Sequence, residues 1–213
     1  MNNRRSFITG IKSTVLSKKE IKFLKKYKPW GVILFSRNIK SLKNTNILTK
    51  QIRKLFKDDK YPILLDQEGG RVNRLKNFIN TDSFTGEFFG NLYLKDKKKF
   101  YDYYKIFTNH TSFLLKTIGI NINTVPVLDL RSKGSSSIIG DRSFSKNPKV
   151  VSTIGDICID SFHRNKIGTI IKHIPGHGLA KVDSHKLTPT IKEKRKYLLK
   201  NDFLPFKNKA SLF

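Results

Sequence analysis

The side chains best suited to chemistry lie between positions 172 and 185 of the sequence. This segment is too polar to be mainly core, since its side chains include Lys172, three histidines and an aspartate, namely His173, His177, His185 and Asp183. In an extended loop, residues two apart point the same way, so the Asp183 carboxylate can hydrogen-bond the His185 imidazole. That contact fixes the tautomer of the ring and raises its pKa from the reference value of about 6.5. A histidine held in this way is a competent general acid and base near neutral pH.

Two other interpretations of this segment stay open. Asp183 could cap the loop by accepting hydrogen bonds from backbone N–H groups, which leaves His185 exposed. His173 and His177 have the spacing of a zinc-binding helix, but the Pro-Gly pair between them is incompatible with a helix. A metal site would therefore have to form in a loop and recruit Asp183 and His185, and we do not favour it.

A second polar segment follows the apolar run 61–65. Asp66 stands directly after this run, and the chain continues with two glycines and two arginines, of which Arg74 is the last. Asp66 could accept hydrogen bonds from vicinal hydroxyls, and Gly69 and Gly70 would let the backbone turn close to a ligand. The plainer alternative is an ordinary turn that contains an Asp–Arg ion pair.

A third candidate is Arg142, which lies in the segment 139–144, shortly before a predicted helix that Asn147 caps. Its planar guanidinium could clamp a ligand oxygen with two parallel hydrogen bonds. A surface salt bridge to Asp141 or Asp129 is the alternative. All three polar segments come after predicted strands, so the arrangement of the strands decides whether they meet.

Short apolar runs of strand length alternate with segments of helical spacing along the chain. The predicted strands are residues 7–11, 31–35, 61–65, 120–125 and 168–171. The predicted helices, the first of which has a Ser-x-x-Glu capping box, are residues 17–27, 44–56, 100–118, 147–162 and 191–206. This alternation predicts a parallel sheet with right-handed crossovers, either open and doubly wound or part of a (β/α)8 TIM barrel. In both, the active site lies at the carboxyl ends of the strands, where the candidate residues stand.

The choice between these two α/β folds depends on motifs and length. No Gly-x-Gly-x-x-Gly turn follows a predicted strand, which disfavours a dinucleotide-binding doubly wound sheet. A closed barrel needs eight strands, usually in about 250 residues, whereas this chain has 213. A barrel-type sheet would therefore be incomplete, with unpaired edges at its first and last strands.

The formal charge of +27 results from 43 Lys and Arg against 16 Asp and Glu. A nucleic-acid binder could have such a charge, because clustered basic residues neutralise phosphates. Here the basic residues are mostly Lys, run through every segment and accompany abundant Asn, Ile and Phe, as expected from an AT-biased genome. We therefore expect no nucleic-acid partner, and a basic nucleic-acid-associated protein is kept only as an alternative.

Neither a secretory signal nor a membrane span is predicted. The N-terminal residues lack a sustained apolar region, and no run approaches the roughly 20 apolar residues that span a bilayer. Cys158 is the single cysteine and lies between two isoleucines, so we expect a buried, inert thiol and no disulfide framework. A cytoplasmic protein without a membrane partner is the expectation.

Six motifs taken together resemble a known family. In chain order they read GVILFSRN, DQEGGRV, PVLD, IGDRSF, KHIPGHG and DSH, at residues 31–38, 66–72, 126–129, 139–144, 172–178 and 183–185. Their order and intervals are similar to those of the glycoside hydrolase family 3 β-N-acetylhexosaminidases used in peptidoglycan recycling. The similarity extends from about residue 7 to about residue 206.

The resemblance implies a TIM barrel that removes N-acetylglucosamine from the non-reducing end of muropeptide fragments, with retention of configuration and without a metal or other cofactor. The motif positions imply His185 as the acid/base and Asp183 as its partner. They also imply contacts to the sugar hydroxyls and the N-acetyl group from Asp66, Arg74, Arg142, Lys172 and His173. A histidine acid/base departs from the usual pair of carboxylates, but the spacing of Asp183 and His185 suggested the same role.

The resemblance further implies a nucleophile, an Asp in a Ser-Asp-Asp-like segment several dozen residues beyond the Asp-Ser-His motif. No such segment follows residue 185, and Glu193 and Asp202 are expected in or beside the last helix, on the outer wall of a barrel. We therefore expect one truncated domain, residues 1–213, with about five of the eight βα units and no activity without the nucleophile. A non-catalytic N-acetylglucosamine-binding module is the alternative, and the oligomeric state is not predicted.

Overall fold

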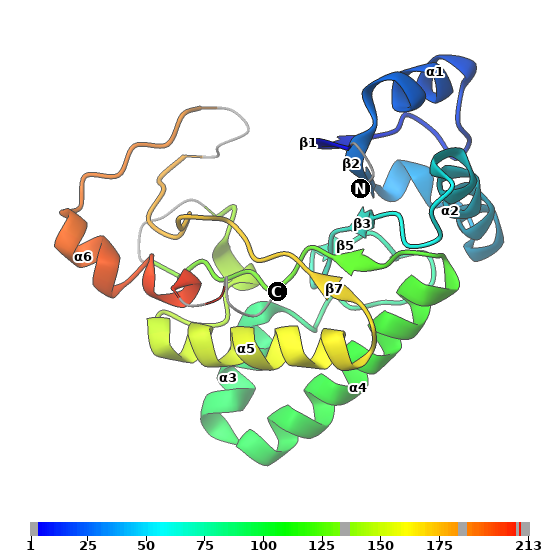
Figure 1. The fold of residues 1–213 in the computed structure, drawn as a ribbon. Coiled ribbons are helices and arrows are strands. Elements are labelled where there is room, and N and C mark those ends of the chain that lie inside the picture. The colour runs from blue at the N-terminus through cyan, green and yellow to red at the C-terminus, as the bar shows by residue number, and fades with distance from the viewer. Residues whose placement is uncertain (1–3, 133–136, 183–186, 208, 210–213) are drawn as a thin grey trace.

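The computed structural model describes residues 4–132, 137–182, 187–207 and 209. Within these residues the main sheet is parallel and has five strands in the order β1-β2-β3-β6-β7 (Figure 1). The strands are β1 (Arg5–Gly10), β2 (Pro29–Leu34), β3 (Ile63–Leu65), β6 (Ile122–Asn123) and β7 (Gly168–Thr169). The α-helices are α1 (Lys18–Tyr27), α2 (Leu42–Phe56), α3 (Gly86–Lys95), α4 (Lys97–Thr117), α5 (Pro148–Arg164) and α6 (Arg195–Lys200). The short 3-10 turns are η1 (Ser36–Asn38), η2 (Gly140–Arg142) and η3 (Leu204–Phe206).

The spatial order of the strands follows their order in the chain. Val32 lies opposite Ile63, and Ile122 lies opposite both Leu64 and Gly168, in parallel pairs throughout. A doubly wound sheet reverses its order at a switch point, whereas a barrel adds each strand beside the preceding one. The sheet therefore has the barrel arrangement, and no pairing joins β1 to β7 among the described residues. The predicted incomplete TIM-barrel fold is confirmed.

The helix boundaries follow local signals in the sequence. Ser17 caps α1 and forms the predicted capping box with Glu20. Lys28 ends α1 in the left-handed conformation, and β2 begins at the next residue, Pro29. Asn147 caps α5, which has a proline at its first position, as predicted. These contacts satisfy backbone groups that the first turn of a helix leaves without partners.

The chain between β3 and α4 contains elements that the hydrophobic pattern does not predict. β4 (Gln67–Gly69) and β5 (Val72–Asn73) form a short antiparallel hairpin, and α3 follows it. Strands of two or three residues are too short to show an alternating pattern. The predicted last helix, 191–206, is wrong in length, because α6 ends at Lys200 and the chain turns at Asn201 before η3.

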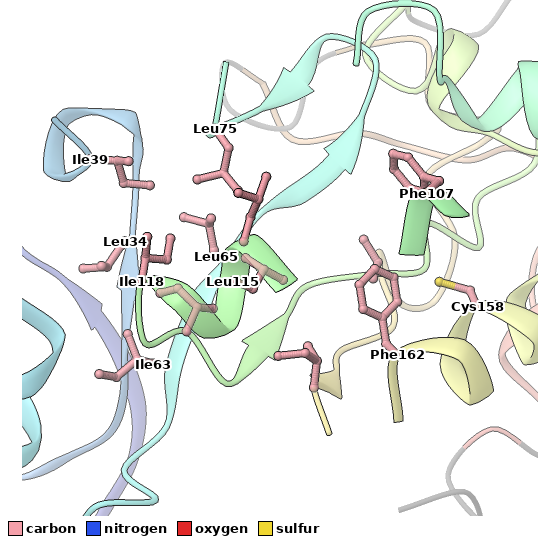
Figure 2. Close-up of a cluster of buried hydrophobic side chains, with 14 of the residues drawn as sticks. Leu34, Ile39, Ile63, Leu65, Leu75, Phe107, Leu115, Ile118, Cys158 and Phe162 are labelled. Carbon is pink, nitrogen blue, oxygen red and sulfur yellow. The ribbon is translucent and has the colours of Figure 1, made fainter. Parts of the chain in front are cut away.

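The core is one cluster of apolar side chains. Figure 2 shows its part around β3, with Leu65 and Leu115, and its part between α4 and α5, with Phe107 and Phe162. Cys158 lies in the second part, and burial raises the pKa of its thiol to about 12, so the prediction of a buried, inert thiol is confirmed. None of the helices in the described ranges is both long and apolar enough to cross a membrane.

Candidate active site

Three parallel strands bring polar side chains to the same edge of the sheet. Asp66 follows β3, Thr124 follows β6, and Lys172 lies shortly beyond β7. A bridge between Val127 and Lys172 continues the β6–β7 pairing, and the Leu128 N–H donates to the Lys172 carbonyl at 2.8 Å. Because the carboxyl ends of parallel strands meet at one edge, the side chains that follow them lie close together. We call this place the carboxyl edge, and its polar residues are Asp66, Glu68, Arg74, Thr124, Asp129, Arg142, Lys172 and His173.

Asp66 lies between two cations. Lys172 Nζ is 3.0 Å from Asp66 Oδ1, Arg74 Nη2 is 3.5 Å from Oδ2, and the Thr124 hydroxyl donates to Oδ1. Burial raises the pKa of Asp66, but the charges of Lys172 and Arg74 and the hydrogen bond from Thr124 outweigh burial and hold the pKa below its usual value. The carboxylate is therefore ionised at neutral pH. The contact with Arg74 is the Asp–Arg ion pair that the sequence suggested for an ordinary turn. The contact with Lys172, by contrast, joins residues 106 positions apart.

Glu68 binds two cations at once. Arg142 Nε and Nη2 donate to its two oxygens, both at 2.8 Å, and Lys172 Nζ lies 2.5 Å from Oε1. Burial raises the pKa of Glu68, but the hydrogen bonds from Arg142 and the charge of Lys172 outweigh burial and hold this pKa below its usual value. Glu68 is therefore a buried carboxylate whose charge is neutralised from two sides.

The planar guanidinium of Arg142 binds Glu68 and neither of the two aspartates that the sequence suggested as partners. The predicted alternative, a surface salt bridge to Asp141 or Asp129, is wrong. Asp141 pairs instead with Arg71, whose Nε lies 3.0 Å from Oδ1, and Arg71 Nη2 also donates to three backbone carbonyls of the same loop. Two arginines, Arg71 and Arg142, thus tie the β4–β5 hairpin to the loop before α5.

Asp129 anchors the loop after β7. Its side chain is fully buried, and its Oδ2 lies 2.6 Å from His173 Nδ1 and 3.2 Å from the backbone nitrogen of the same residue. Its Oδ1 accepts from the His177 N–H at 2.6 Å. Because the carboxylate accepts at Nδ1, that nitrogen carries the proton, and His173 Nε2 is left as an acceptor 3.4 Å from Arg142 Nη2. Asp129 thereby sets both the position and the tautomer of His173.

The predicted acid/base pair and the metal alternative depend on residues that the structure does not describe. Asp183 and His185 both lie outside the described residues. The rings of His173 and His177 are 6.2 Å apart between centroids. In the described ranges, no three His, Cys, Asp or Glu side chains gather as ligands for a metal ion. The catalytic roles of Asp183 and His185 stay predictions.

The β4–β5 hairpin presents Glu68 to the carboxyl edge. Gly69 and Gly70 turn the hairpin with positive φ angles of 96° and 52°, which side chains disfavour. A Cβ on Gly69 would lie 2.4 Å from the carbonyl oxygen of Phe84, so the close approach predicted for a ligand is made here by the chain itself. The Gln67 backbone donates at 3.0 Å to the side chain of Asn123 at the end of β6, which donates back at 2.9 Å.

Asp202 lies elsewhere than expected. A Cβ on Gly176 would be 2.9 Å from Asp202 Cβ, so this carboxyl packs against the loop after β7. Asp202 is 3% exposed, and its oxygens have no hydrogen-bond partner in the described part of the chain. Burial, aided by the charge of Asp129, raises the pKa of Asp202 to about 6. The expected position on the outer wall is wrong because the chain leaves α6 at Asn201 and packs back onto this loop.

The residues predicted to contact the sugar come from distant segments and form one network: Asp66, Arg74, Arg142, Lys172 and His173. Their binding role stays a prediction. Glu68 and Asp129 also join this network; Glu68 was not predicted there, and Asp129 was expected only as an alternative surface partner of Arg142. Glu68 stands two positions after Asp66, and that spacing could have suggested a common direction. Their partners lie 74 and 44 positions away, which no local pattern reveals.

The family of the chain follows from its similarity to known proteins. Residues 9–210 match the glycosyl hydrolase family 3 N-terminal domain. The chain belongs to glycosyl hydrolase family 3. It is 33% identical over 201 residues to beta-hexosaminidase A of Pseudoalteromonas piscicida, which covers 91% of this chain and 32% of that relative. It is 33% identical over 216 residues to a beta-hexosaminidase of Actinobacillus pleuropneumoniae, with 96% of this chain and 58% of the relative covered.

Solved structures share the fold. NagZ from Neisseria gonorrhoeae, in complex with N-trifluoroacetyl-D-glucosamine, superposes with a TM-score of 0.86 at 28% identity and covers 95% of this chain and 59% of its own. A family 3 β-N-acetylglucosaminidase from Paenibacillus sp. str. FPU-7 has a TM-score of 0.79 at 23% identity, over 97% of this chain and 39% of its own, and supports the fold alone. The chain spans between about a third and three fifths of the length of these relatives.

Proposed function

We propose that this chain carries the sugar-binding and acid/base part of a β-N-acetylhexosaminidase that removes terminal N-acetylglucosamine from peptidoglycan fragments. The observation that carries the proposal is the ionised Asp66 between Lys172 and Arg74 at the carboxyl edge. A carboxylate only accepts hydrogen bonds and these cations only donate them, so together they can hold several vicinal hydroxyls. The ligand of the Neisseria NagZ structure supports a sugar of this class. The relatives named beta-hexosaminidase support the reaction.

In the proposed complex, each residue of the carboxyl edge has a distinct part. Asp66 accepts hydrogen bonds from sugar hydroxyls, and Arg74 and Lys172 donate to hydroxyl oxygens. Arg142 and His173 supply contacts to the N-acetyl group. These contacts immobilise the sugar ring before bond cleavage. They therefore lower the entropic part of the activation free energy.

For catalysis we propose Asp183 and His185 as the acid/base pair. The His185 imidazolium protonates the glycosidic oxygen as the bond between that oxygen and the anomeric carbon breaks and a carboxylate nucleophile bonds to that carbon. The neutral ring later takes a proton from the water that displaces this carboxylate. Asp183 stabilises the imidazolium. A retaining mechanism also needs a carboxylate nucleophile, which the family pattern places in a Ser-Asp-Asp-like segment. Residues 1–213 as the sugar-binding domain and the cytoplasm as its location belong to the same proposal.

Fluorine NMR can test the sugar-binding part directly. The purified 213-residue chain is titrated into N-trifluoroacetyl-D-glucosamine, and the line width of the trifluoromethyl signal is followed. We expect broadening that unlabelled N-acetylglucosamine reverses by competition and that glucose does not. A signal unchanged at millimolar protein would contradict the proposal.

A parallel assay separates an enzyme from a binding module. The same preparation is incubated with the 4-nitrophenyl glycoside of N-acetylglucosamine, and release of 4-nitrophenol is followed. Turnover that disappears in a His185→Ala variant supports the acid/base role. Binding without turnover supports the non-catalytic sugar-binding module for this chain.

A further inference from the structure

We propose that Glu68 is a positioning residue that holds Arg142 and Lys172 in place for the sugar. This inference rests on the proposed function and adds to it a residue that does not itself contact the substrate. Glu68 reaches the site from the β4–β5 hairpin, whereas Arg142 comes from η2 and Lys172 from the loop after β7. One carboxylate thus connects three separate parts of the chain.

The contacts of Glu68 leave it little capacity for a ligand. Its Oε2 accepts from Arg142 Nε, and its Oε1 accepts from both Arg142 Nη2 and Lys172 Nζ. Its side chain is 7% exposed, against 19% for Asp66. Among the described residues, Asp66 Oδ2 has only the longer Arg74 contact at 3.5 Å. Asp66 is therefore the carboxylate that faces a sugar, and Glu68 acts through its neighbours.

The charges explain why a carboxylate is needed at this position. The side chains of Arg142 and Lys172 are each 13% exposed, and both approach Glu68 Oε1. Two cations this close repel each other, and the attraction of both to an anion between them offsets that repulsion. Without the charge of Glu68, Lys172 would pair with Asp66 alone and compete with the sugar hydroxyls for that carboxylate.

The guanidinium of Arg142 also lies near the His173 ring. Arg142 Nη2 donates to Glu68 Oε1 at 2.8 Å and lies 3.4 Å from His173 Nε2. The guanidinium is rigid and planar, so fixing two of its nitrogens on Glu68 fixes the direction of the whole group. Loss of the fork would leave the hydrogen bond from Arg142 Nη1 to the Ile138 carbonyl at 3.0 Å, but it would let the rest of the guanidinium turn away from His173.

Substitution of Glu68 tests this role in the full 213-residue chain, with N-trifluoroacetyl-D-glucosamine as the probe. Glu68→Gln keeps the shape and removes the charge, and we expect at least a tenfold loss of affinity. Glu68→Asp keeps the charge but is one methylene shorter, and we expect an intermediate loss. Glu87→Gln is the matched control, because Glu87 pairs with Arg131 where both side chains are about 40% exposed, and its affinity should stay within twofold.

A double-mutant cycle separates positioning from simple destabilisation. Because Glu68 also holds Lys172, part of its effect should persist without Arg142, but the loss of affinity that Glu68→Gln causes should be at least threefold smaller in an Arg142→Met background than in the wild-type background. An equal loss in both backgrounds, or unchanged affinity of Glu68→Gln in the wild-type background, overturns the inference. If Glu68→Gln does not fold, Glu68→Asp is used in the same cycle with the same criterion.

The wild-type titration keeps the two proposals apart. Wild-type chain that does not bind the probe contradicts the proposed function. Wild-type chain that binds, while the Glu68 variants bind equally well, contradicts only the positioning role.

Discussion

The two ends of the central sheet use polar side chains in different ways. At the amino ends of the strands, polar side chains bond mostly to the backbone. Tyr61 Oη donates to the Pro29 carbonyl at 2.8 Å, and the Asn121 side chain accepts from the Ile63 N–H at 2.8 Å. At the carboxyl edge, by contrast, charged side chains bond mostly to one another, with Glu68 as the clearest case.

This difference suggests different roles: we expect polar side chains at the amino ends to stabilise the fold and those at the carboxyl edge to bind the sugar. Side chains that pair with buried backbone groups satisfy donors and acceptors that would otherwise be costly to bury. Ion pairs between buried side chains add little net stability, because desolvation offsets their attraction. Ligand binding therefore explains the charge cluster at the carboxyl edge better than stability does. Substitutions at the amino ends should change the free energy of unfolding, and substitutions at the carboxyl edge should change sugar affinity.

The largest effect on stability is expected for Tyr61→Ala. Tyr61 is fully buried and stacks on Phe56 with ring centroids 4.0 Å apart. The free energy of unfolding should fall by about 3–5 kcal/mol, as for other large aromatic truncations. Urea unfolding followed by circular dichroism measures this change.

Tyr61→Phe is the matched control for this variant. It removes only the hydroxyl bond to the Pro29 carbonyl, and the expected loss is about 1 kcal/mol. Both folded variants should keep the sugar affinity of the wild type. A clear loss of affinity in folded Tyr61→Ala would break the division between the two ends of the sheet.

The largest effect on binding is expected for Asp66→Asn. The amide keeps the shape of the carboxyl but loses the charge, and hydrogen bonds to charged groups contribute about 1.5–3 kcal/mol. Affinity for N-trifluoroacetyl-D-glucosamine should fall by about 10–100-fold, measured by fluorine NMR. The thermal midpoint should also fall, because the stability that ionised Asp66 contributes is lost, although Lys172 keeps its pairing with Glu68. A variant that binds normally would remove Asp66 from the site.

The Asp66→Asn variant also tests a pH dependence. The pKa of Asp66 is lower in the folded protein than its usual value. The ionised form therefore contributes stability that is present above the unfolded pKa of about 3.9 and is lost as the pH falls through the folded pKa. Urea unfolding between about pH 5 and 2 should show a shallower loss in Asp66→Asn than in the wild type. Equal slopes would argue against the Asp66–Lys172 pair.

Asp202 should have the opposite pH dependence. Its folded pKa of about 6 lies above the ordinary value, so its contribution is full at low pH and is lost as the pH rises through about 6. Asp202→Asn, which stays neutral, should raise the free energy of unfolding by about 1–2 kcal/mol near pH 7.5. Near pH 3.5 the gain should disappear, as checked by urea unfolding at both values. A gain that does not depend on pH would contradict the raised pKa.

The smallest effect is expected for Arg4→Gln at the amino ends of the strands. Arg4 pairs with Asp58 and lies over the Tyr61 ring, 4.8 Å from its centroid. Partly exposed pairs of this kind contribute about 0.5–1 kcal/mol, so the thermal midpoint should drop only slightly. Sugar affinity should not change. A loss of sugar affinity in Arg4→Gln, like one in Tyr61→Ala, would contradict the division between the two ends of the sheet.

Local patterns were sufficient for most of the framework. The Ser17–Glu20 box and the Asn147 cap act within one helical turn. The strands β2 and β3 stand out in the sequence as runs of consecutive apolar residues, which the structure buries. Such signals depend on neighbours in the sequence, so the sequence alone contains them.

Helix α3 was not predictable for a reason that lies elsewhere in the molecule. Gly86 and Gly90 weaken its helical signal. A Cβ at Gly86 would lie 2.1 Å from the Arg142 carbonyl oxygen, and one at Gly90 would lie 1.6 Å from the Phe144 carbonyl oxygen. These glycines are required by the contact with the segment that carries Arg142, which is visible only once the chain is folded.

The sequence by itself determined the alternation of strands and helices, the family and five of the residues that gather at the carboxyl edge. It did so because strand ends and motifs are local features, and parallel strands bring their carboxyl ends together. The tertiary structure alone decided the pairing: Arg142 binds Glu68 and not its neighbour Asp141, and Lys172 lies between Asp66 and Glu68. Ion pairs between distant segments depend on where each loop places its charge in space, and spacing along the chain does not contain that information.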